Sequence, residues 1–565
     1  MGRFNAQVQI QPKNSPKVTG ISNAKPNTVN KAGGEAYSMP LRHEIATCVL
    51  NSMLNDGFYA KAQDNLTQLQ GLVERADKAG DLEFVAKAAI YARHTHGLRT
   101  VSHLLAGEIG DRARGEAWKR PFYSAVIQRP DDVCEVLSYW NARHPGVRHP
   151  NAMLRGFGQA LVRFDAYALA KYRGQGGKEV NLVDAVNLCH PRAPKGHAIH
   201  KLMTGKLEAA DTWEKAISAA GKIEAEGTDE EIDAAKTEAK GEEWKRLIKE
   251  KKLGYLALLR NLRNIAAQAP DALQDALAVI EDEKAVLKSR VFPFQFRKAY
   301  EIGKSLHSAQ GRLIMIAVAK AADISLRNVP AFPGKTLVVV DDSGSMTGGG
   351  EDSPIKIASI FAAALMKALP TAEYMQFASD ARFMNLDCVG MSLFALAEKI
   401  EASATNGSTN FVSIFTETAR HRKVFDRVII LSDMQGWVQN GVQEMFAKYA
   451  HACRQSGGQT PKLYSFDLKG HGTAMFPADQ VCLMAGFSDK VFTVMGQMEQ
   501  DRDALVKEIE AVNFGAAVAA NEARAKARTE KHAPVEYEKA PKAVRKAKAT
   551  AKKKPGKKSA KARKR

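Results

Sequence analysis

Cysteine is scarce in this 565-residue sequence, and its six copies never form a C-x-x-C pair. A disulfide framework or a zinc knuckle is therefore not indicated, and we expect free, mostly buried thiols. Long apolar runs are also missing. No stretch approaches the about 18 apolar residues of a membrane helix, and the start, MGRFNAQVQIQPKNSPK, lacks the apolar centre of a signal peptide. We expect a soluble, cytoplasmic protein with no membrane partner.

Acidic side chains are fewer than basic ones. The chain has 62 Asp and Glu against 82 Lys and Arg, which gives a formal net charge of +20. Residues 539–565 alone carry 14 basic and no acidic side chains, so only +6 remains for everything before them. An excess of this size indicates a polyanionic partner, with nucleic acid as the default. Most of it is nevertheless concentrated in one tail.

The signatures of common enzymes are incomplete. His43 and Glu44 begin the zinc-protease pattern H-E-x-x-H, but Thr47 occupies the second histidine position. The GKT at 334–336 ends like a phosphate loop, but Val329 stands where the first glycine belongs, and no G-x-S-x-G occurs. We therefore expect a binding protein and not an enzyme.

The apolar pattern is helical from about Leu41 to Leu326. Segments such as LEFVAKAAIYARH and ALLRNLRNIAAQ place apolar side chains at i, i+3, i+4 and i+7, as one buried helix face requires. Such helices with short connections favour stacked pairs of the HEAT or armadillo kind, although no strict repeat period is present. Residues 224–243, with nine acidic side chains against two lysines, are expected to face solvent.

The pattern predicts four segments along the chain. Residues 1–36 are expected to form a flexible arm, and residues 37–330 a helical-repeat domain. Residues 331–515 alternate helices with the short apolar runs KTLVVVD, EYMQFAS, RVIILSD, KLYSFDL and KVFTVM, which predicts a parallel, doubly wound α/β sheet. Residues 516–565 are expected to be a linker and a disordered Lys/Arg-rich tail.

Oxygen-bearing side chains follow the first strand of that sheet. LVVVDDSGSM places Asp341, Ser343 and Ser345 at the carboxyl edge, where open α/β folds bind ligands. Thr409, at the start of a helix, and Asp433, at the end of RVIILSD, offer two further oxygens. Carboxylates and hydroxyls suit magnesium, which prefers octahedral oxygen coordination. The alternative is that these residues only cap helices.

This D-x-S-x-S…T…D set resembles the metal-ion-dependent adhesion site of von Willebrand factor A domains. The resemblance implies that Ser343, Ser345 and Thr409 bind the metal directly, and that Asp341 and Asp433 act directly or through water. It also implies an open position for a partner's carboxylate, and it supplies no general base for hydrolysis.

Four stretches of the helical part resemble the TROVE domain of the Ro autoantigen family, including its bacterial orthologues. They are GYLALLRNLRNI (254–265), SRVFPFQFRKAY (289–300), ALAKYRGQGG (168–177) and AVNLCHPR (185–192). The resemblance implies a monomeric ring of HEAT-like repeats closed by the A domain. Such rings bind small Y RNAs on an outer basic surface and accept single-stranded 3′ ends of misfolded RNAs in a central hole. It also implies a 3′-exoribonuclease partner, polynucleotide phosphorylase.

Y RNA contacts in that family follow a K-x-x-x-R…H pattern, whose lysine falls on Lys171 and whose histidine falls on His190. The arginine position holds Gln175, but Arg173, two residues earlier, can reach the same phosphate. From the residues alone, Lys171 lies near the end of a helix predicted over 157–172, where a cation suits the helix dipole. A solvated helix-end lysine and a structural histidine therefore stay open as alternatives.

Arg260 and Arg263 form a second basic stretch with lysines upstream. They are either exposed helix charges or phosphate contacts along the ring, where arginine also stacks on unpaired bases.

Our leading hypothesis is a non-enzymatic RNA-binding protein of RNA quality control and small-RNA stabilisation. The alternatives are a metal-dependent protein-interaction scaffold in which RNA is secondary, and a metal-dependent hydrolase. The sequence leaves open whether KKKPGKK is a nuclear import signal or an electrostatic arm.

Overall fold

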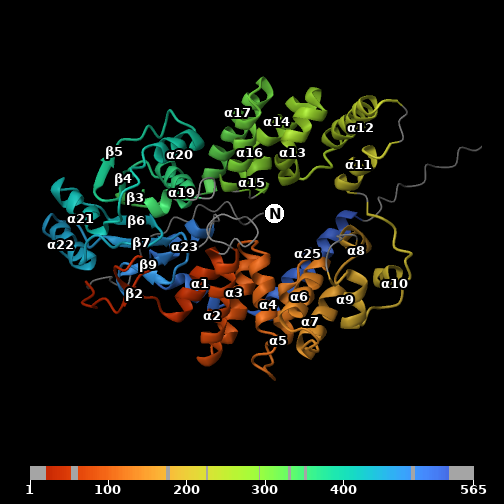
Figure 1. The fold of residues 1–565 in the computed structure, drawn as a ribbon, viewed down its shortest axis with the longest axis horizontal. Helices are drawn as coiled ribbons and strands as arrows, with labels where there is room; N and C mark the ends of the chain where they lie inside the picture. Colours follow the sequence, from red (N-terminus) through yellow and green to blue (C-terminus); the bar gives the residue numbers. More distant parts are fainter. Residues whose placement is uncertain are drawn as a thin grey trace, which may run out of the picture.

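The computed structural model describes residues 21–532 except 52–61, 174–178, 211, 224–226, 290, 292, 329–331, 349–352, 485–489 and 500. Helices from residue 41 to residue 328 form an arc (Figure 1). A domain built on a central sheet lies between the two ends of the arc and closes it into a ring. The predicted combination of a helical ring with a doubly wound α/β domain is confirmed.

The first part of the arc contains ten helices, each of which packs on helices that are close to it in the sequence. They are α1 (Leu41–Asn51), α2 (Ala62–Lys78), α3 (Leu82–His94), α4 (Thr100–Glu108), α5 (Lys119–Val126), α6 (Pro130–Arg143), α7 (Asn151–Leu161), α8 (Ala166–Tyr172), α9 (Leu182–Cys189) and α10 (Ala198–Met203).

The second part of the arc returns to the sheet domain. It contains α11 (Trp213–Ala220), α12 (Asp229–Lys249), α13 (Tyr255–Gln268), the 3₁₀ turn η1 (Pro270–Ala272), α14 (Leu273–Glu281), α15 (Glu283–Ser289), α16 (Pro293–Ser305), α17 (Ala309–Ser325) and the 3₁₀ turn η2 (Leu326–Asn328). The acidic residues of 227–240 lie on the largely exposed first half of α12, and Trp244 anchors its buried end by donating Nε1–H to Gln268 Oε1 at 2.9 Å.

The single helix predicted over 157–172 is wrong. The chain forms two helices there, because α7 ends at Leu161 and α8 begins only after Asp165, whose carboxylate accepts the Ala168 N–H at 2.7 Å as an N-cap. Between them Arg163 donates to the carbonyls of Ser124 and Ile127, both at 2.8 Å. Arg163 is therefore a packing residue and does not belong to an exposed polar face.

The central sheet has the strand order β5-β4-β3-β6-β7-β9, parallel except for the edge strand β5. Its strands are β3 (Thr336–Asp341), β4 (Glu373–Phe377), β5 (Ala381–Met384), β6 (Arg427–Ser432), β7 (Lys462–Asp467) and β9 (Val481–Met484). Its helices are α18 (Gly344–Thr347), α19 (Pro354–Ala368), α20 (Leu393–Ala402), α21 (Phe411–Arg420), α22 (Val442–Gln455), α23 (Lys490–Met498) and α24 (Ala504–Glu510). This topology fits a von Willebrand A-like domain.

Alternate residues of β3 serve opposite faces of the sheet. Val338 and Val340 pack into the cluster that contains α19 and α20, whereas Leu337 and Val339 pack into the cluster that contains α21 and α22. All four side chains are fully buried. Burial on both faces explains why the strand reads as an unbroken apolar run and not as an alternating one.

The strand predicted at KVFTVM is wrong, because residues 490–498 form helix α23. Phe492, Met495 and Met498 are buried at helical spacing, and Phe492 lies with its ring centroid 5.9 Å from that of Phe361 on α19. A short apolar run is compatible with both the strand period of two and the helix period of 3.6 residues. The residues it packs against therefore decide which structure forms.

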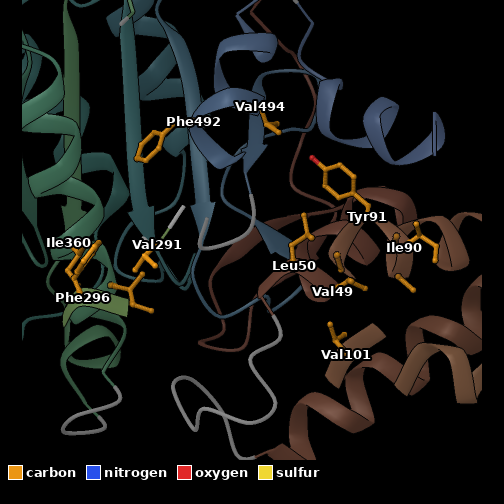
Figure 2. Packing of buried hydrophobic residues seen from close by; sticks show 14 of the residues in the cluster. Val49, Leu50, Ile90, Tyr91, Val101, Val291, Phe296, Ile360, Phe492 and Val494 are labelled. Carbon is orange, nitrogen blue, oxygen red and sulfur yellow. The ribbon is translucent and has the colours of Figure 1, made fainter. Parts of the chain in front are cut away.

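The sheet domain meets the arc at two seams. At one seam α16 packs on α19 and α20: the rings of Tyr300 and Phe394 lie 4.7 Å apart, and Arg297 pairs with Glu401 at 2.9 Å. At the other seam α24 packs on α1 and α3, where Tyr91 donates its hydroxyl to Glu508 at 2.6 Å. Figure 2 shows residues from both seams, which belong to one continuous buried cluster.

The prediction of a flexible arm over residues 1–36 is wrong for residues 21–36, the part that the structure describes. β1 (Thr28–Val29) and β2 (Glu35–Ser38) form a hairpin, and β2 pairs antiparallel with β8 (Thr473–Ala474), with Tyr37 opposite Ala474. Asn30 holds the hairpin turn, because its Oδ1 accepts the N–H groups of Ala32 and Gly34, each at 3.0 Å. The polar composition that suggested flexibility supplies turn hydrogen bonds instead.

The prediction of a linker from residue 516 is also wrong for the described residues, because the chain forms helix α25 (Phe514–His532) there. This helix returns to the arc and packs on α5 and α3. Asn521 donates Nδ2–H to the carbonyls of Ala125 at 2.8 Å and Ile127 at 3.2 Å. The predicted disordered tail lies outside the described residues.

Two other sequence expectations can be compared with the structure. None of the six cysteines, all of which lie in the described residues, forms a disulfide, and five of them are buried, as predicted. In the described part of the chain, no helix is both long enough and apolar enough to span a membrane.

The contact between α25 and α5 can be tested by substituting Phe514. Its ring lies 6.0 Å from Trp118 and 5.9 Å from Phe122, and its side chain is buried. We expect Phe514→Ala to destabilise the protein by about 3 kcal/mol, because it removes a buried ring and leaves a cavity. Thermal unfolding followed by circular dichroism measures this. Val389→Ala, at a side chain that is 97% exposed, is the control, and equal midpoints for both variants would contradict a packing role for α25.

Candidate functional site

Three loops meet at the carboxyl edge of the sheet. The first follows β3, the second precedes α21, and the third follows β6. The Gly344 N–H donates to the Gly407 carbonyl at 3.0 Å, and the Asn406 N–H donates to the Asp342 carbonyl at 3.1 Å. These backbone bonds hold the loop of Asp341, Ser343 and Ser345 against the loop of Thr409.

Asp341 is fully buried at the end of β3. Its Oδ1 accepts the Ser343 N–H at 3.0 Å, and its Oδ2 accepts the Ser432 hydroxyl at 2.6 Å. Burial, followed by repulsion from Asp433, raises the pKa of Asp341 to about 7. Two carboxylates are therefore held close together in a place where water stabilises neither.

Two hydroxyl groups of the predicted set lie close together at this edge. Ser343 Oγ and Ser345 Oγ are 3.3 Å apart, so both hydroxyls face the same small volume. Thr409 is 3% exposed, and its carbonyl accepts the N–H of Trp437 at 3.1 Å. The backbone of the loop after β6 is thus attached directly to a predicted metal ligand.

Asp433 is the carboxylate with the fewest partners at this edge. It is fully buried, and neither of its side-chain oxygens accepts a hydrogen bond from the described residues. Lys469 Nζ lies 3.1 Å from Asp433 Oδ2 as an ion pair and donates to the Ser345 carbonyl at 3.0 Å. Sequence reasoning missed Lys469, because it comes from the loop after β7 and no local motif places it at this edge.

The donor set fits a magnesium ion. Among the described residues no three His, Cys, Asp or Glu side chains gather as a metal cluster, so the two carboxylates need the three hydroxyls to complete a set. A buried carboxylate without hydrogen bonds and two hydroxyls 3.3 Å apart offer hard oxygen ligands to a hard cation. Asp341, Ser343, Ser345, Thr409 and Asp433 would hold it.

Two further aspartates follow strands at this edge. Asp342 does not face solvent: its carboxylate is buried and accepts from Arg382 at 2.6 Å and from the Thr405 N–H at 2.8 Å. It therefore braces the loop that leads to Thr409. Asp467, at the end of β7, is also buried, and burial raises its pKa to about 7.

Three of the predicted RNA contacts, Lys171, Arg173 and His190, lie on or at the ends of α8 and α9 (Figure 1). Lys171, in the last turn of α8, has Nζ 3.9 Å from Glu214 and 5.9 Å from the Tyr172 ring centre. Arg173 is exposed and donates to the Leu207 carbonyl at 3.3 Å. His190 ends α9 with a φ of 45° and is exposed. Gln175 lies outside the described residues.

Arg260 and Arg263 lie on the exposed side of α13, opposite the buried Leu258, Leu259 and Leu262. This helix packs on α12, α14 and α16, whereas α8 packs on α6 and α10. The structure therefore separates these two arginines from the set around Lys171 and does not combine them into one surface.

Comparison with known proteins identifies the helical part. Residues 175–318 match the sequence model of the TROVE domain. This segment of the helical arc is similar to a TROVE domain. In fold it is similar to the crystal structure of the Ro (RSR) protein of Deinococcus radiodurans, with a TM-score of 0.55 and 19% sequence identity over 81% of this chain and 100% of that one. The TROVE match itself covers α9 to α17, including Arg260 and Arg263, and it begins just after Lys171 and Arg173.

Two curated mammalian proteins are also similar. Telomerase protein component 1 of Rattus norvegicus is 21% identical and that of Mus musculus 22% identical, each over 305 residues. The match covers 39% of this chain but only 11% of either relative, so this chain corresponds to a small part of them.

The proposed metal centre can be tested with the substitution Asp341→Ala. We expect it to abolish magnesium binding, because it removes the carboxylate that fixes the Ser343 loop, while the ring and most RNA affinity remain. Isothermal titration with Mg²⁺ and RNA filter binding measure the two effects. Asp380→Ala, at an exposed aspartate after β4, is the matched control. An equal loss of RNA binding in a folded Asp341→Ala protein would contradict separate sites.

Proposed function

We propose that this protein is a non-enzymatic noncoding-RNA-binding protein. Y-like small RNAs bind the surface of Lys171, Arg173 and His190, and single-stranded 3′ ends of misfolded RNAs enter the central hole of the ring. The match of residues 175–318 to the TROVE domain carries this proposal. The ring arrangement of the helices and the sheet domain supports its second part.

The environment of Lys171 suits exchange of one anion for another. Its contact with Glu214 is long, at 3.9 Å, and the two side chains are 30% and 47% exposed, so this ion pair contributes little to stability. A phosphate can replace the carboxylate at small cost. Arg173 just after α8 and the exposed His190 at the end of α9 add two donors, and such phosphate contacts position an RNA without reading its sequence.

The metal centre has a binding role in this proposal. A bound Mg²⁺ would supply an open coordination position to an anionic oxygen of a partner. Asp341 accepts two hydrogen bonds, and Asp433 faces Lys469, so neither carboxylate is placed as a free general base. We further propose that a 3′-exoribonuclease of the polynucleotide phosphorylase type is a protein partner.

A direct experiment compares two forms of one structured RNA. One form carries a single-stranded 3′ tail and the other is blunt-ended. We expect tight filter binding of the tailed form and weak binding of the blunt form. Equal binding of the two would count against entry of 3′ ends into the ring. Sequencing the RNA that co-purifies with the native protein identifies the natural ligand.

The Lys171 surface is tested by Lys171→Ala combined with His190→Ala. We expect this variant to weaken a Y-like RNA far more than a single-stranded 3′ end, because the two RNAs use different surfaces. Gel-shift titrations with both RNAs measure it. The control is Lys448→Ala with His451→Ala, an exposed lysine and histidine on α22. Equal weakening of both RNAs would be incompatible with two sites.

The basic tail at 539–565 is tested by deletion. Its 14 cations have no aromatic neighbours for stacking on bases, so they add affinity without sequence preference. If about five of them engage single-stranded RNA, deletion should flatten the slope of log K against log salt by about three to four.

Binding across a salt series decides this, with a variant in which the 14 residues are changed to Gln as the length-matched control. Preference among RNAs should survive the deletion. An unchanged slope would show that the tail takes no part in RNA binding.

A further inference from the structure

The side chain of Lys469 lies across the carboxyl edge of the sheet. Its Nζ atom is 3.1 Å from Asp433 Oδ2 and donates a hydrogen bond to the Ser345 carbonyl at 3.0 Å. Only 19% of the Lys469 side chain is exposed, so its ammonium group is partly shielded from water. Lys469 therefore connects the end of β6 with the loop after β3, and both of these segments carry residues of the proposed ligand set.

The backbone around Lys469 is held from two directions. Within the sheet domain, Asp467 Oδ1 accepts the N–H of Lys469 at 3.1 Å and the N–H of Gly470 at 2.8 Å. From the arc, Gln68 on α2 donates to the Gly470 carbonyl. A Cβ atom at Gly470 would lie 3.6 Å from the Cys48 Cα on α1, so this backbone also packs on the arc. The ammonium group can therefore leave the edge only by rotation of the Lys469 side chain.

The buried acids at this edge need a compensating cation. Asp341, Asp433 and Asp467 are buried there, and Asp341 and Asp433 repel each other. Among the described residues, Lys469 is the cation that forms an ion pair with one of these three carboxylates. Lys31 is close by, but its Nζ contacts His471 Nδ1, at 3.0 Å. Because a buried carboxylate is costly unless it is paired, Lys469 stabilises this edge.

The ammonium group of Lys469 and a metal ion use the same oxygen ligands. Lys469 contacts the Asp433 carboxylate and the backbone of Ser345, and both residues belong to the set that would hold magnesium. A divalent cation that approaches Asp433 meets the positive charge of Lys469 at the same carboxylate. The repulsion between like charges is stronger at such a partly buried position than in bulk water. The two cations are therefore expected to exclude each other.

We propose that Lys469 competes with magnesium for Asp433 and thereby sets the magnesium affinity of the centre. The ammonium group neutralises Asp433 while no ion is bound, and it turns toward solvent before the ion binds. This inference rests on the proposed metal centre and adds the residue that determines its affinity. It has a second consequence: in a protein without this lysine, the stability of the edge depends on magnesium.

Isothermal titration with magnesium chloride tests the competition on the full-length protein. We expect Lys469→Gln to bind magnesium about tenfold more tightly than wild type, because the ion no longer displaces an ammonium group. Lys469→Arg keeps a positive charge at this position and should bind magnesium like wild type. Lys448→Gln is the matched control, because it removes an exposed lysine of the same domain, whose Nζ pairs with Glu444 at 3.0 Å.

Thermal unfolding in EDTA and in saturating magnesium gives a readout that does not depend on the titration. We expect Lys469→Gln to unfold at a lower temperature than wild type in EDTA, since Asp433 then loses its ion-pair partner. Magnesium should raise the unfolding midpoint of Lys469→Gln by more than it raises that of wild type, because ligand binding stabilises the folded state.

The outcomes separate the inference from the metal centre itself. If wild type binds magnesium and Lys469→Gln binds it equally or more weakly, the inference is wrong and the centre stands. Tight binding by Lys469→Arg, equal to that of Lys469→Gln, would also overturn the inference, because charge would not be the cause. Uptake by Lys469→Gln alone would support it. If neither wild type nor Lys469→Gln takes up magnesium, the proposed metal centre fails, and the inference fails with it.

Discussion

Closure of the helical arc by the sheet domain is the constraint on which the rest of the structure depends. The arc presents apolar surface at both ends, on α1 and α3 at one end and on α16 at the other. The sheet domain covers the apolar surface at each end, as terminal repeats of a helical stack require. The two seams use different chemistry. The α16 seam combines the Tyr300–Phe394 contact with a partly buried arginine, whereas the α24 seam places acids such as Glu508 against Tyr91.

The three buried aspartates at the carboxyl edge of the sheet differ in how well neighbouring groups compensate their charge. Asp342 has an arginine and a backbone N–H, and Asp341 has a hydroxyl and a backbone N–H. Among the described residues, the Asp433 side chain has only the ion pair with Lys469. A buried carboxylate is costly unless it is paired and hydrogen-bonded, so Asp433 is the group that gains most from a cation. Lys469 supplies part of that compensation from a loop that also contacts the arc, since Gln68 donates to the carbonyl of Gly470.

The sequence predicts features that depend on local periodicity and fails where a distant partner decides. The β3 and β6 runs could be recognised because both faces are buried, and parallel register then places Asp341 and Asp433 at one edge. The hairpin at 28–38 could not be recognised, because its partner β8 is at residue 473 and its own composition is polar. The apolar pattern of VFTVM is compatible with a strand or a helix. The choice depends on the contact between Phe492 and Phe361 of α19, which the sequence does not reveal. Residues 157–172 look like one helix until Asp165 is seen to start a second.

Helix α25 gives the ring a particular order of assembly. Asn521 bonds to the carbonyl of Ala125, 396 residues earlier, and Phe514 covers Trp118 and Phe122. On the ribosome, α3 and α5 therefore emerge long before the segment that completes their core. At about 5–20 residues per second, these aromatic side chains wait tens of seconds for it. During synthesis the aromatic side chains of α5 therefore stay uncovered until α25 has emerged and packed on them.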